Sequence, residues 1–401
     1  MTGEAPPGVG TAPDARALAA EFLLDPEVVF LNHGSFGACP RPVFEVYQAW
    51  QRELERQPVS FLQREFPGLM AQARSRLAGY VGAAADDLVY VPNATTGVNV
   101  VARSLGLGPG DEVVTTDHEY GACDRTWRFL CAKRGAAYRR VALPLPVTSA
   151  DEVVERVWSA VGPRTRVLFI SQITSPTALT LPVAPLVARA REAGVLTLVD
   201  GAHVPGQLPL DVEALGADFY TGNCHKWLCA PKGAGFLHAR REVQGLLEPL
   251  VVSWGWEPEV PGPSRFVDEQ EWTGTRDVAA YLSVPAAIDY EAARAWPEVQ
   301  ARCRALARRA RAGLVALPGI GPVASDDESW TAQMAAVVLP AGTDVEALKA
   351  RLYDDHRVEV PTLMWEGRPM LRVSVQGYNS YEDVDALVGA VEACLVGLGV
   401  G

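Results

Sequence analysis

The chain has 401 residues, of which 48% are hydrophobic and 21% are charged, a balance typical of a globular protein with a large core. Its 36 basic and 48 acidic residues give a net charge of −12, which argues against nucleic acid or an anionic membrane as a partner. No apolar run is long enough to span a bilayer. The seven cysteines lack the spacing of a metal site or a disulfide framework, so we expect reduced thiols, no metal and a cytoplasmic location.

The N-terminal region begins with residues 1–14, which lack the pattern of a signal peptide and are expected to form a disordered leader. A helix is predicted near 15–25, followed by the turn-rich string N-H-G-S-F-G from Asn32 to Gly37. Considered alone, this string is typical of a surface loop. Two more helical patterns follow at 42–57 and 65–82.

The first candidate binding feature is the strand Leu88–Val91, which runs through the turn P-N-A-T-T-G into a helix beginning near Thr95. Backbone N–H groups and the dipole at a helix N-terminus favour an anion, and the hydroxyls of Thr95 and Thr96 can add donors. The pattern therefore indicates a phosphate site, although N-capping by either threonine would also explain it.

Two further strands end in polar residues. The strand Glu112–Thr115 leads into D-H-E-Y, and the strand Val167–Ile170 leads into S-Q-I-T-S. Ligands of doubly wound α/β folds bind outside the carboxyl ends of parallel strands. The candidates to contact a cofactor or substrate are therefore His118, Tyr120, Gln172, Thr174 and Ser175.

The most informative stretch runs from Val195 to Gly235. An apolar run there ends at Asp200, and a second short run leads into the triplet His225-Lys226-Trp227 and a glycine-rich turn. A carboxylate at the end of a buried strand is costly unless it meets a cation, and a lysine in such a turn is unusual for a surface residue. One arrangement explains both: pyridoxal phosphate held by Lys226 as a Schiff base, with Asp200 on its pyridinium nitrogen.

The D-G-A-H and H-K strings at 200–203 and 225–226 resemble those of the class V aminotransferase family of fold-type-I pyridoxal phosphate enzymes, in particular its isopenicillin N epimerase-like branch. The resemblance extends from Asn32 to about Glu382. It implies an α/β fold with a mostly parallel seven-stranded sheet between helices and a smaller C-terminal α/β domain, and the alternation of strands and helices agrees. The implied parts are an N-terminal segment covering the active site (15–45), a large cofactor-binding domain (46–290) and a small domain (291–401).

The resemblance also implies roles for single residues. It places His118 on the cofactor ring, opposite Lys226, and it brings the N-terminal segment over the substrate. The further residues implied at the cofactor or substrate are Asn32, His33, His203 and His225.

A homodimer is implied by the same resemblance. In the string E-W-T-G-T-R-D at 271–277, Thr275 would reach the phosphate of the partner subunit's cofactor. The active sites would then be shared at the interface between the two subunits.

The remaining C-terminal features are aromatic and basic. Trp254, Trp256 and Trp272 are too many aromatic residues for an ordinary surface loop, so Trp256 is a candidate substrate contact, with an oligomer interface as the alternative. A single long helix is predicted at 277–314. Beyond it Arg372 stands in the strand pattern M-L-R-V-S-V, and because a buried arginine must pair or face a ligand, its guanidinium fits an α-carboxylate. The resemblance gives Arg372 the same role.

The expected chemistry starts at Cα of an amino acid. Pyridoxal phosphate takes up the electron pair left when Cα loses its proton, and Lys226 is then free to move protons. Reprotonation of the opposite face gives epimerisation, for which His118 or Tyr120 would supply the proton. Reprotonation at the cofactor gives transamination, and loss of a β-substituent gives a lyase. We expect an amino-acid epimerase or racemase, with a C–S lyase or an aminotransferase as the alternative.

Two other functions are less consistent with the sequence. A cysteine desulfurase needs a nucleophilic cysteine in its C-terminal part, and none occurs between Ser325 and Asn379. A non-catalytic ligand-binding regulator of this fold carries an extra basic DNA-binding module, whereas this chain is acidic.

Overall fold

The computed structural model describes residues 12–398. Most of the expected leader, residues 1–11, lies outside this range. Within the described residues, no helix is both long enough and apolar enough to cross a membrane.

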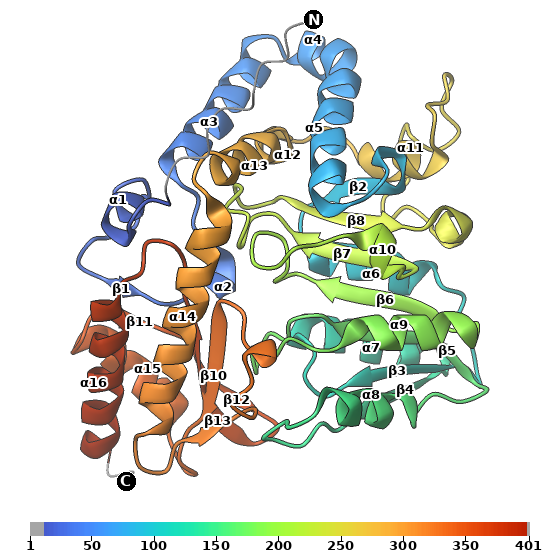
Figure 1. Ribbon diagram of the computed structural model, residues 1–401. Helices are drawn as coiled ribbons and strands as arrows, with labels where there is room; N and C mark the ends of the chain where they lie inside the picture. Colours follow the sequence, from blue (N-terminus) through green and yellow to red (C-terminus); the bar gives the residue numbers. More distant parts are fainter. Residues whose placement is uncertain (1–11, 399–401) are drawn as a thin grey trace, which may run out of the picture.

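The structure is built around a seven-stranded sheet with the strand order β2-β8-β7-β6-β5-β3-β4 (Figure 1). From β7 to β4 the neighbouring strands pair in parallel, while β8 is antiparallel to both of its neighbours. The mostly parallel seven-stranded sheet is thus confirmed. Its strands are β2 (Leu88–Val91), β3 (Glu112–Thr116), β4 (Ala137–Val141), β5 (Thr165–Ser171), β6 (Leu196–Gly201), β7 (Phe219–Asn223) and β8 (Gly235–Ala239).

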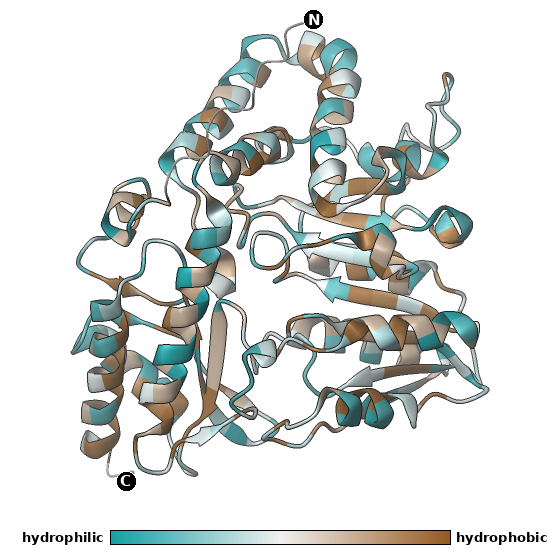
Figure 2. Ribbon diagram, in the orientation of Figure 1, coloured by the Kyte–Doolittle hydropathy of each residue, from teal (hydrophilic) through white to brown (hydrophobic). Residues whose placement is uncertain are grey.

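Both faces of this sheet are covered. Successive strand residues point to opposite sides, so each strand contributes side chains to two apolar clusters. In β5, Val167 and Phe169 pack into one apolar cluster, and Leu168 and Ile170 pack into the other. Figure 2 shows β6 as hydrophobic along most of its length and hydrophilic at its carboxyl end. The first cluster includes α6 (Ala94–Ser104) and α7 (Gly121–Arg134), and the second includes α5 (Phe66–Val81), α8 (Ala150–Trp158) and α9 (Val183–Glu192).

A second, antiparallel sheet forms the C-terminal part, in the order β12-β13-β10-β9. The N-terminal segment joins this part, because β1 pairs in parallel with β11. In Figure 1 the carboxyl end of β6 points toward β10 and α14. The elements are β1 (Val29–Phe30), β9 (Gly321–Pro322), β10 (Met334–Val338), β11 (Val358–Glu359), β12 (Thr362–Trp365), β13 (Arg368–Ser374), α14 (Trp296–Val315), α15 (Val345–Asp354) and α16 (Tyr381–Gly397).

A helical layer covers the β2 end of the large sheet, where α3 and α5 pack against α12 and α13. The remaining helices are α1 (Ala15–Ala19), α2 (His33–Phe36), α3 (Arg41–Arg56), α4 (Pro58–Ser60), α10 (Val212–Leu215), α11 (Arg265–Glu271), α12 (Ala279–Leu282) and α13 (Val284–Ala292).

The single helix predicted at 277–314 is wrong. The segment forms α12, α13 and α14 instead, and Pro285 and Pro297 stand in the first turns of the last two. Ala295, just before α14, has a φ of 45° and turns the chain. Proline lacks the N–H that a helix interior needs, but it is well suited to a first turn.

Glu291 in α13 is a buried carboxyl group with an incomplete set of partners. The Tyr80 hydroxyl donates to its Oε2 at 2.8 Å, and its Oε1 has no partner among residues 12–398. Burial raises the pKa of Glu291 to about 8. Between about pH 5 and pH 8 the folded protein therefore keeps a proton that the unfolded chain releases, so the stability contributed by this group falls as the pH rises.

We expect Glu291→Gln to be more stable than the wild type at about pH 9, and to differ little at about pH 5, because glutamine stays neutral. The difference in unfolding free energy should approach about 1.4 kcal/mol for each unit by which the pKa of Glu291 is raised. Thermal unfolding of both proteins at the two pH values measures it, with the exposed Glu192→Gln as the control. An equal difference between Glu291→Gln and the wild type at both pH values would contradict the assignment.

Candidate active site

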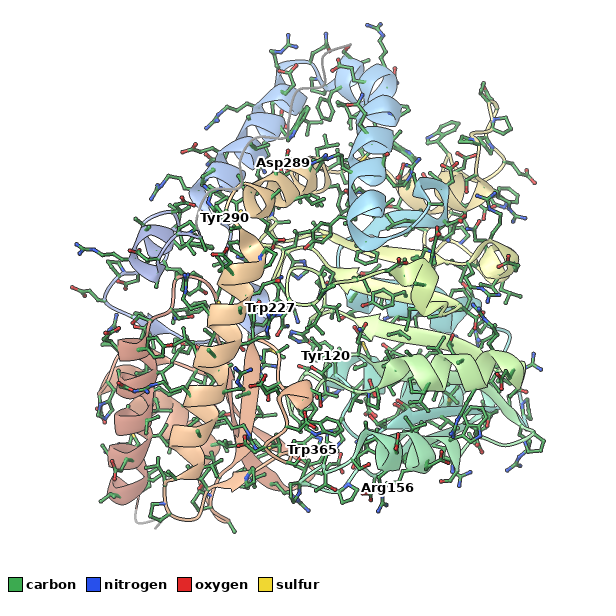
Figure 3. All side chains as sticks on the ribbon, in the orientation of Figure 1. Tyr120, Arg156, Trp227, Asp289, Tyr290 and Trp365 are labelled. Atoms are coloured by element: carbon green, nitrogen blue, oxygen red, sulfur yellow. The ribbon has the colours of Figure 1, made fainter. Side chains whose placement is uncertain are left out.

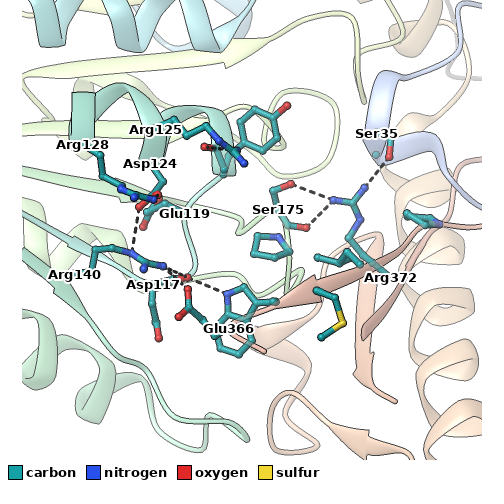
Figure 4. A pocket seen from close by; sticks show the side chains of 18 of the residues that line it. Ser35, Asp117, Glu119, Asp124, Arg125, Arg128, Arg140, Ser175, Glu366 and Arg372 are labelled. Atoms are coloured by element: carbon teal, nitrogen blue, oxygen red, sulfur yellow. Dashed lines mark hydrogen bonds and ion pairs between the residues drawn. The ribbon is translucent and has the colours of Figure 1, made fainter. Parts of the chain in front are cut away.

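Two adjoining cavities lie at the carboxyl end of β6, where ligands bind in folds of this kind. The smaller has a volume of about 170 Å³ and includes Asp200 and Thr95 in its wall. The larger, of about 520 Å³, opens beside Arg372 and is shown in Figure 4. Both cavities are lined by Ser35, Phe36, Tyr120, Ser175 and Lys226.

Asp200, at the carboxyl end of β6, is a buried carboxylate facing the smaller cavity. Its Oδ1 accepts from the Ala202 N–H at 2.9 Å, and the Cys123 thiol donates to Oδ2 at 3.5 Å. Burial raises the pKa of Asp200, opposed by the Ala202 hydrogen bond and by the charge of Lys226. A buried acid with so few partners suits a cationic group placed in the cavity.

Lys226 reaches the same cavity from the turn after β7. Burial and the charge of Arg372 lower its pKa to about 7, while the charge of Asp200 opposes this shift. Its Nζ lies 3.2 Å from Nε2 of His203, and His203 Nδ1 accepts from the Trp227 indole N–H at 3.2 Å. Neutral His203 therefore carries its proton on Nε2 and donates it to the lysine amine. Lys226 is thus available as a neutral nucleophile near neutral pH.

The N-terminal segment clamps the backbone of this turn. His33 donates from Nε2 to the carbonyl of Lys226 at 2.9 Å, and its Nδ1 accepts from the Tyr378 hydroxyl at 2.9 Å. Burial lowers the pKa of His33 to about 3, so the ring is neutral. Gly37 has a φ of 71°, and a Cβ there would lie 2.0 Å from the carbonyl oxygen of His225. His33 therefore supports the lysine from behind, and it does not line either cavity.

The N-terminus of α6 borders the smaller cavity. Asn93 caps the helix by accepting from the Thr96 N–H at 2.9 Å, and the Thr96 hydroxyl donates to the same oxygen at 3.1 Å. Thr95 lines the cavity, and its hydroxyl has no partner within the described part of the chain. Of the two predicted threonines, Thr95 faces the site and Thr96 serves as part of the cap.

The loop after β3 places Tyr120, rather than His118, at the cavities. His118 is fully buried: its Nδ1 lies 2.7 Å from the Thr177 hydroxyl, its Nε2 lies 3.1 Å from the carbonyl of Leu143, and its ring packs on Trp365. Because both ring nitrogens have buried partners, the ring is held behind the wall. Tyr120 is 46% exposed and lines both cavities, and Figure 3 shows it between the large sheet and the C-terminal part.

Arg372 in β13 is 5% exposed and forms one wall of the larger cavity. It donates to the Ser175 carbonyl at 2.6 Å and hydroxyl at 3.2 Å, and to the Ser35 hydroxyl at 3.0 Å (Figure 4). Its Nε has no partner among the described residues. Thr174 is buried beneath this wall, where its hydroxyl bonds Thr177 and the Leu179 N–H.

The opposite end of the larger cavity is polar. Arg140 of β4 pairs with Asp124 at 3.2 Å and with Glu366 in the turn between β12 and β13, and Arg128 lies 3.6 Å from Asp124 (Figure 4). Leu363 and Met364 of β12 also line this cavity.

Five other predicted residues do not line the cavities, and one of them, Gln172, accepts from the Tyr220 hydroxyl at 2.8 Å. Asn32 donates to Glu359 at 2.9 Å and accepts from the Ser35 hydroxyl, and His225 bonds the Ala234 carbonyl at 2.9 Å. Trp256 and Thr275 are exposed elsewhere on the surface.

The sequence did not single out several residues that the structure brings to the site. Ser35 and Phe36 belong to the N-H-G-S-F-G string. The aromatic ring of Phe36 in this polar turn was the signal that could have pointed to a ligand contact. Cys123 and Glu119 gave no such signal. Glu119 lines the larger cavity, accepts from the Ser171 N–H and hydroxyl at 2.9 and 2.6 Å, and has its pKa raised to about 7 by burial.

Comparison with known proteins identifies close relatives. An isopenicillin N epimerase of Amycolatopsis lactamdurans is 42% identical over 93% of this chain and 96% of its own length. One from Streptomyces clavuligerus is 38% identical over 95% and 98%. A putative L-cysteine desulfhydrase of Oryza sativa subsp. japonica is 31% identical over 94% and 85%.

Among solved structures, the cysteine desulfurase CsdA of Escherichia coli superposes with a TM-score of 0.81 and covers 96% of this chain and 99% of its own, at 24% identity. The model of the family described as aminotransferase class-V matches residues 39–387. The Lys226 amine, the buried Asp200 and the free Thr95 hydroxyl around one small cavity fit its cofactor. The chain belongs to the aminotransferase class-V family and is a pyridoxal-phosphate-dependent enzyme of fold type I.

Proposed function

We propose that this enzyme epimerises an amino acid at Cα, and that isopenicillin N is its substrate. The proposal is supported by the two epimerases that are 42% and 38% identical over nearly the whole chain. The structural observation that carries it is the 520 Å³ cavity joined to the cofactor cavity at Lys226, which has room for a substrate much larger than cysteine.

We assign the residues of the smaller cavity to the cofactor. Lys226 attaches it, Asp200 holds the ring nitrogen, and Thr95 with the N-terminus of α6 binds the phosphate. Tyr120 takes the stacking role expected of His118. When bound, pyridoxal phosphate supplies an acceptor for the electron pair left on Cα.

Arg372 and Lys226 orient the substrate. Arg372, with its Nε unpaired, binds the α-carboxylate, and its burial strengthens that ion pair. Lys226 then lies beside Cα as a neutral amine that accepts its proton. The remainder of the substrate extends along Leu363 and Met364 toward the polar end at Arg140 and Asp124.

We also assign a homodimer. The segment 250–260 exposes large apolar side chains, with Trp254 at 81% and Val260 at 86%, above a groove of about 560 Å³. Exposure of this extent is typical of a subunit interface. Trp256 and Thr275 then face the partner subunit, and light scattering should give the mass of two chains. A stable monomer would contradict the assignment.

A direct assay tests the function. The purified enzyme, loaded with pyridoxal phosphate, is incubated separately with isopenicillin N and with L-cysteine. We expect inversion at the side-chain Cα of isopenicillin N. Chromatographic separation of the two epimers measures it. Sulfide release from L-cysteine with no inversion would instead support the lyase alternative, which the 31% identical desulfhydrase favours.

A further inference from the structure

We propose that Tyr120 is the second acid–base residue of the reaction, exchanging a proton with the face of Cα opposite Lys226. The proposal rests on the epimerisation proposed above. An epimerase that uses one base on each face needs such a partner for its lysine.

The sheet places the two residues on either side of Asp200. The strand order is β7-β6-β5-β3, and Lys226 follows β7, Asp200 ends β6, and Tyr120 follows β3. Lys226 therefore lies on the β7 side of Asp200 and Tyr120 on its β3 side, and a ring held by Asp200 would lie between them. The backbone carbonyl of Tyr120 accepts from the N–H groups of Cys123 and Asp124, at 2.9 and 3.0 Å, which fixes it at the start of α7.

The Tyr120 hydroxyl is free to transfer a proton. Among the described residues that line both cavities, the Ser35 hydroxyl donates to Asn32, and the Ser175 hydroxyl accepts from Arg372. The Tyr120 hydroxyl has no partner within residues 12–398, and the residue is 46% exposed and lines both cavities. A phenol is also a far stronger acid than the serine alcohols beside it.

Arg372 stabilises the charge that this transfer creates. Arg372 and Tyr120 both line the larger cavity, and an ionised Tyr120 raises the pKa of Arg372. The same residue thus binds the substrate carboxylate and offsets the negative charge on the phenolate oxygen.

The transfer balances in protons and electrons. The Cα–H bond breaks as an N–H bond forms on Lys226, and the electron pair stays with Cα. The O–H bond of Tyr120 then breaks as a C–H bond forms on the opposite face. The forward direction leaves Lys226 as the ammonium and Tyr120 as the phenolate, and the reverse direction begins from this form with the phenolate as base. Water in the open cavity interconverts the two forms by returning a proton to the phenolate and removing one from the ammonium.

Glu119 is the rival acid, since it lines the larger cavity and burial raises its pKa to about 7. Its Oε2 accepts two hydrogen bonds from Ser171, and its Oε1 accepts from the Thr116 hydroxyl at 2.7 Å. It does not line the cofactor cavity. The test therefore compares Tyr120→Phe with Glu119→Gln.

The wild type and both variants are incubated in D2O with each epimer of isopenicillin N. We expect Tyr120→Phe to slow interconversion at least about 100-fold. It should still place deuterium on Cα of one epimer with retained configuration, because Lys226 serves that face. Tyr120→Phe should also bind pyridoxal phosphate with the affinity and visible absorbance of the wild type, because the ring is kept, whereas Tyr120→Ala should bind it more weakly.

The possible failures are separable. A wild type that inverts neither epimer contradicts the proposed function itself. Inversion by Tyr120→Phe at the wild-type rate, or selective loss of inversion in Glu119→Gln alone, overturns only the role of Tyr120. Loss of cofactor binding in Tyr120→Phe also overturns it, because the hydroxyl would then be a cofactor contact.

Discussion

Replacing Lys226 with alanine is expected to abolish turnover and to remove the visible absorbance of covalently held pyridoxal phosphate. The substitution deletes both the attachment point of the cofactor and the base at Cα, and a general base alone contributes roughly 10²–10⁴-fold. We therefore expect kcat to fall by at least about 10⁴-fold. Absorbance spectra and the epimerisation assay measure the two losses.

The matched control is Lys232→Ala. Lys232 lies in the same glycine-rich turn and is exposed, so the variant removes one lysine charge without entering either cavity. Borohydride should fix the cofactor on the peptide containing Lys226 in the wild type and in Lys232→Ala. Cofactor fixed elsewhere in the wild type, or catalysis retained by Lys226→Ala, would refute the assignment.

The large sheet was predictable because its strands carry a strong local signal. A parallel strand buried on both faces reads as a short, continuous run of apolar and β-branched residues. The run Val167–Ile170 lies in β5, and the run ending at Asp200 lies in β6, and both strands are parallel to their neighbours. The pair Asp200 and Lys226 was predictable for a related reason, since burying either charge is costly without a partner.

The orientation of single side chains was not predictable from local pattern. His118 and Tyr120 lie two residues apart in one loop, and contacts with Thr177, Leu143 and Trp365 hold His118 away from the cavities. Those partners are remote in sequence. Thr95 and Thr96 are neighbours on a helix, where successive side chains point about 100° apart, so one faces the cavity and the other the cap.

The break at 277–314 was visible in the sequence. Pro285 and Pro297 each mark a helix start and could have revealed the two breaks. The break was missed because the residues before and after each proline share a helical periodicity. By contrast, the contact of Cys123 with Asp200 joins α7 to β6 and leaves no local trace. The wall formed by Leu363 and Met364 also depends on how the C-terminal part docks against the large sheet.

Asp200→Asn is expected to leave the fold intact and to lower kcat by roughly 100-fold. Asparagine keeps the shape and can still accept from the Ala202 N–H through Oδ1, but it removes the charge that holds a protonated ring nitrogen. Removing one partner of a buried ion pair costs about 3 kcal/mol or more. As an increase in activation free energy, this amount corresponds to the expected fall of roughly 100-fold in kcat.

The same substitution should also change Lys226 before any cofactor is added. The charge of Asp200 raises the pKa of Lys226, against the stronger lowering by burial and by Arg372 that brings it to about 7. Without that charge the pKa of Lys226 falls further, so the rate at which the apoenzyme takes up pyridoxal phosphate should reach its plateau at a lower pH. Asp124→Asn is the control, because it removes a carboxylate from the far end of the larger cavity only. A pH profile of cofactor uptake unchanged in Asp200→Asn would mean that the two side chains are not electrostatically coupled, and Asp200 would then be an unsuitable partner for the ring nitrogen.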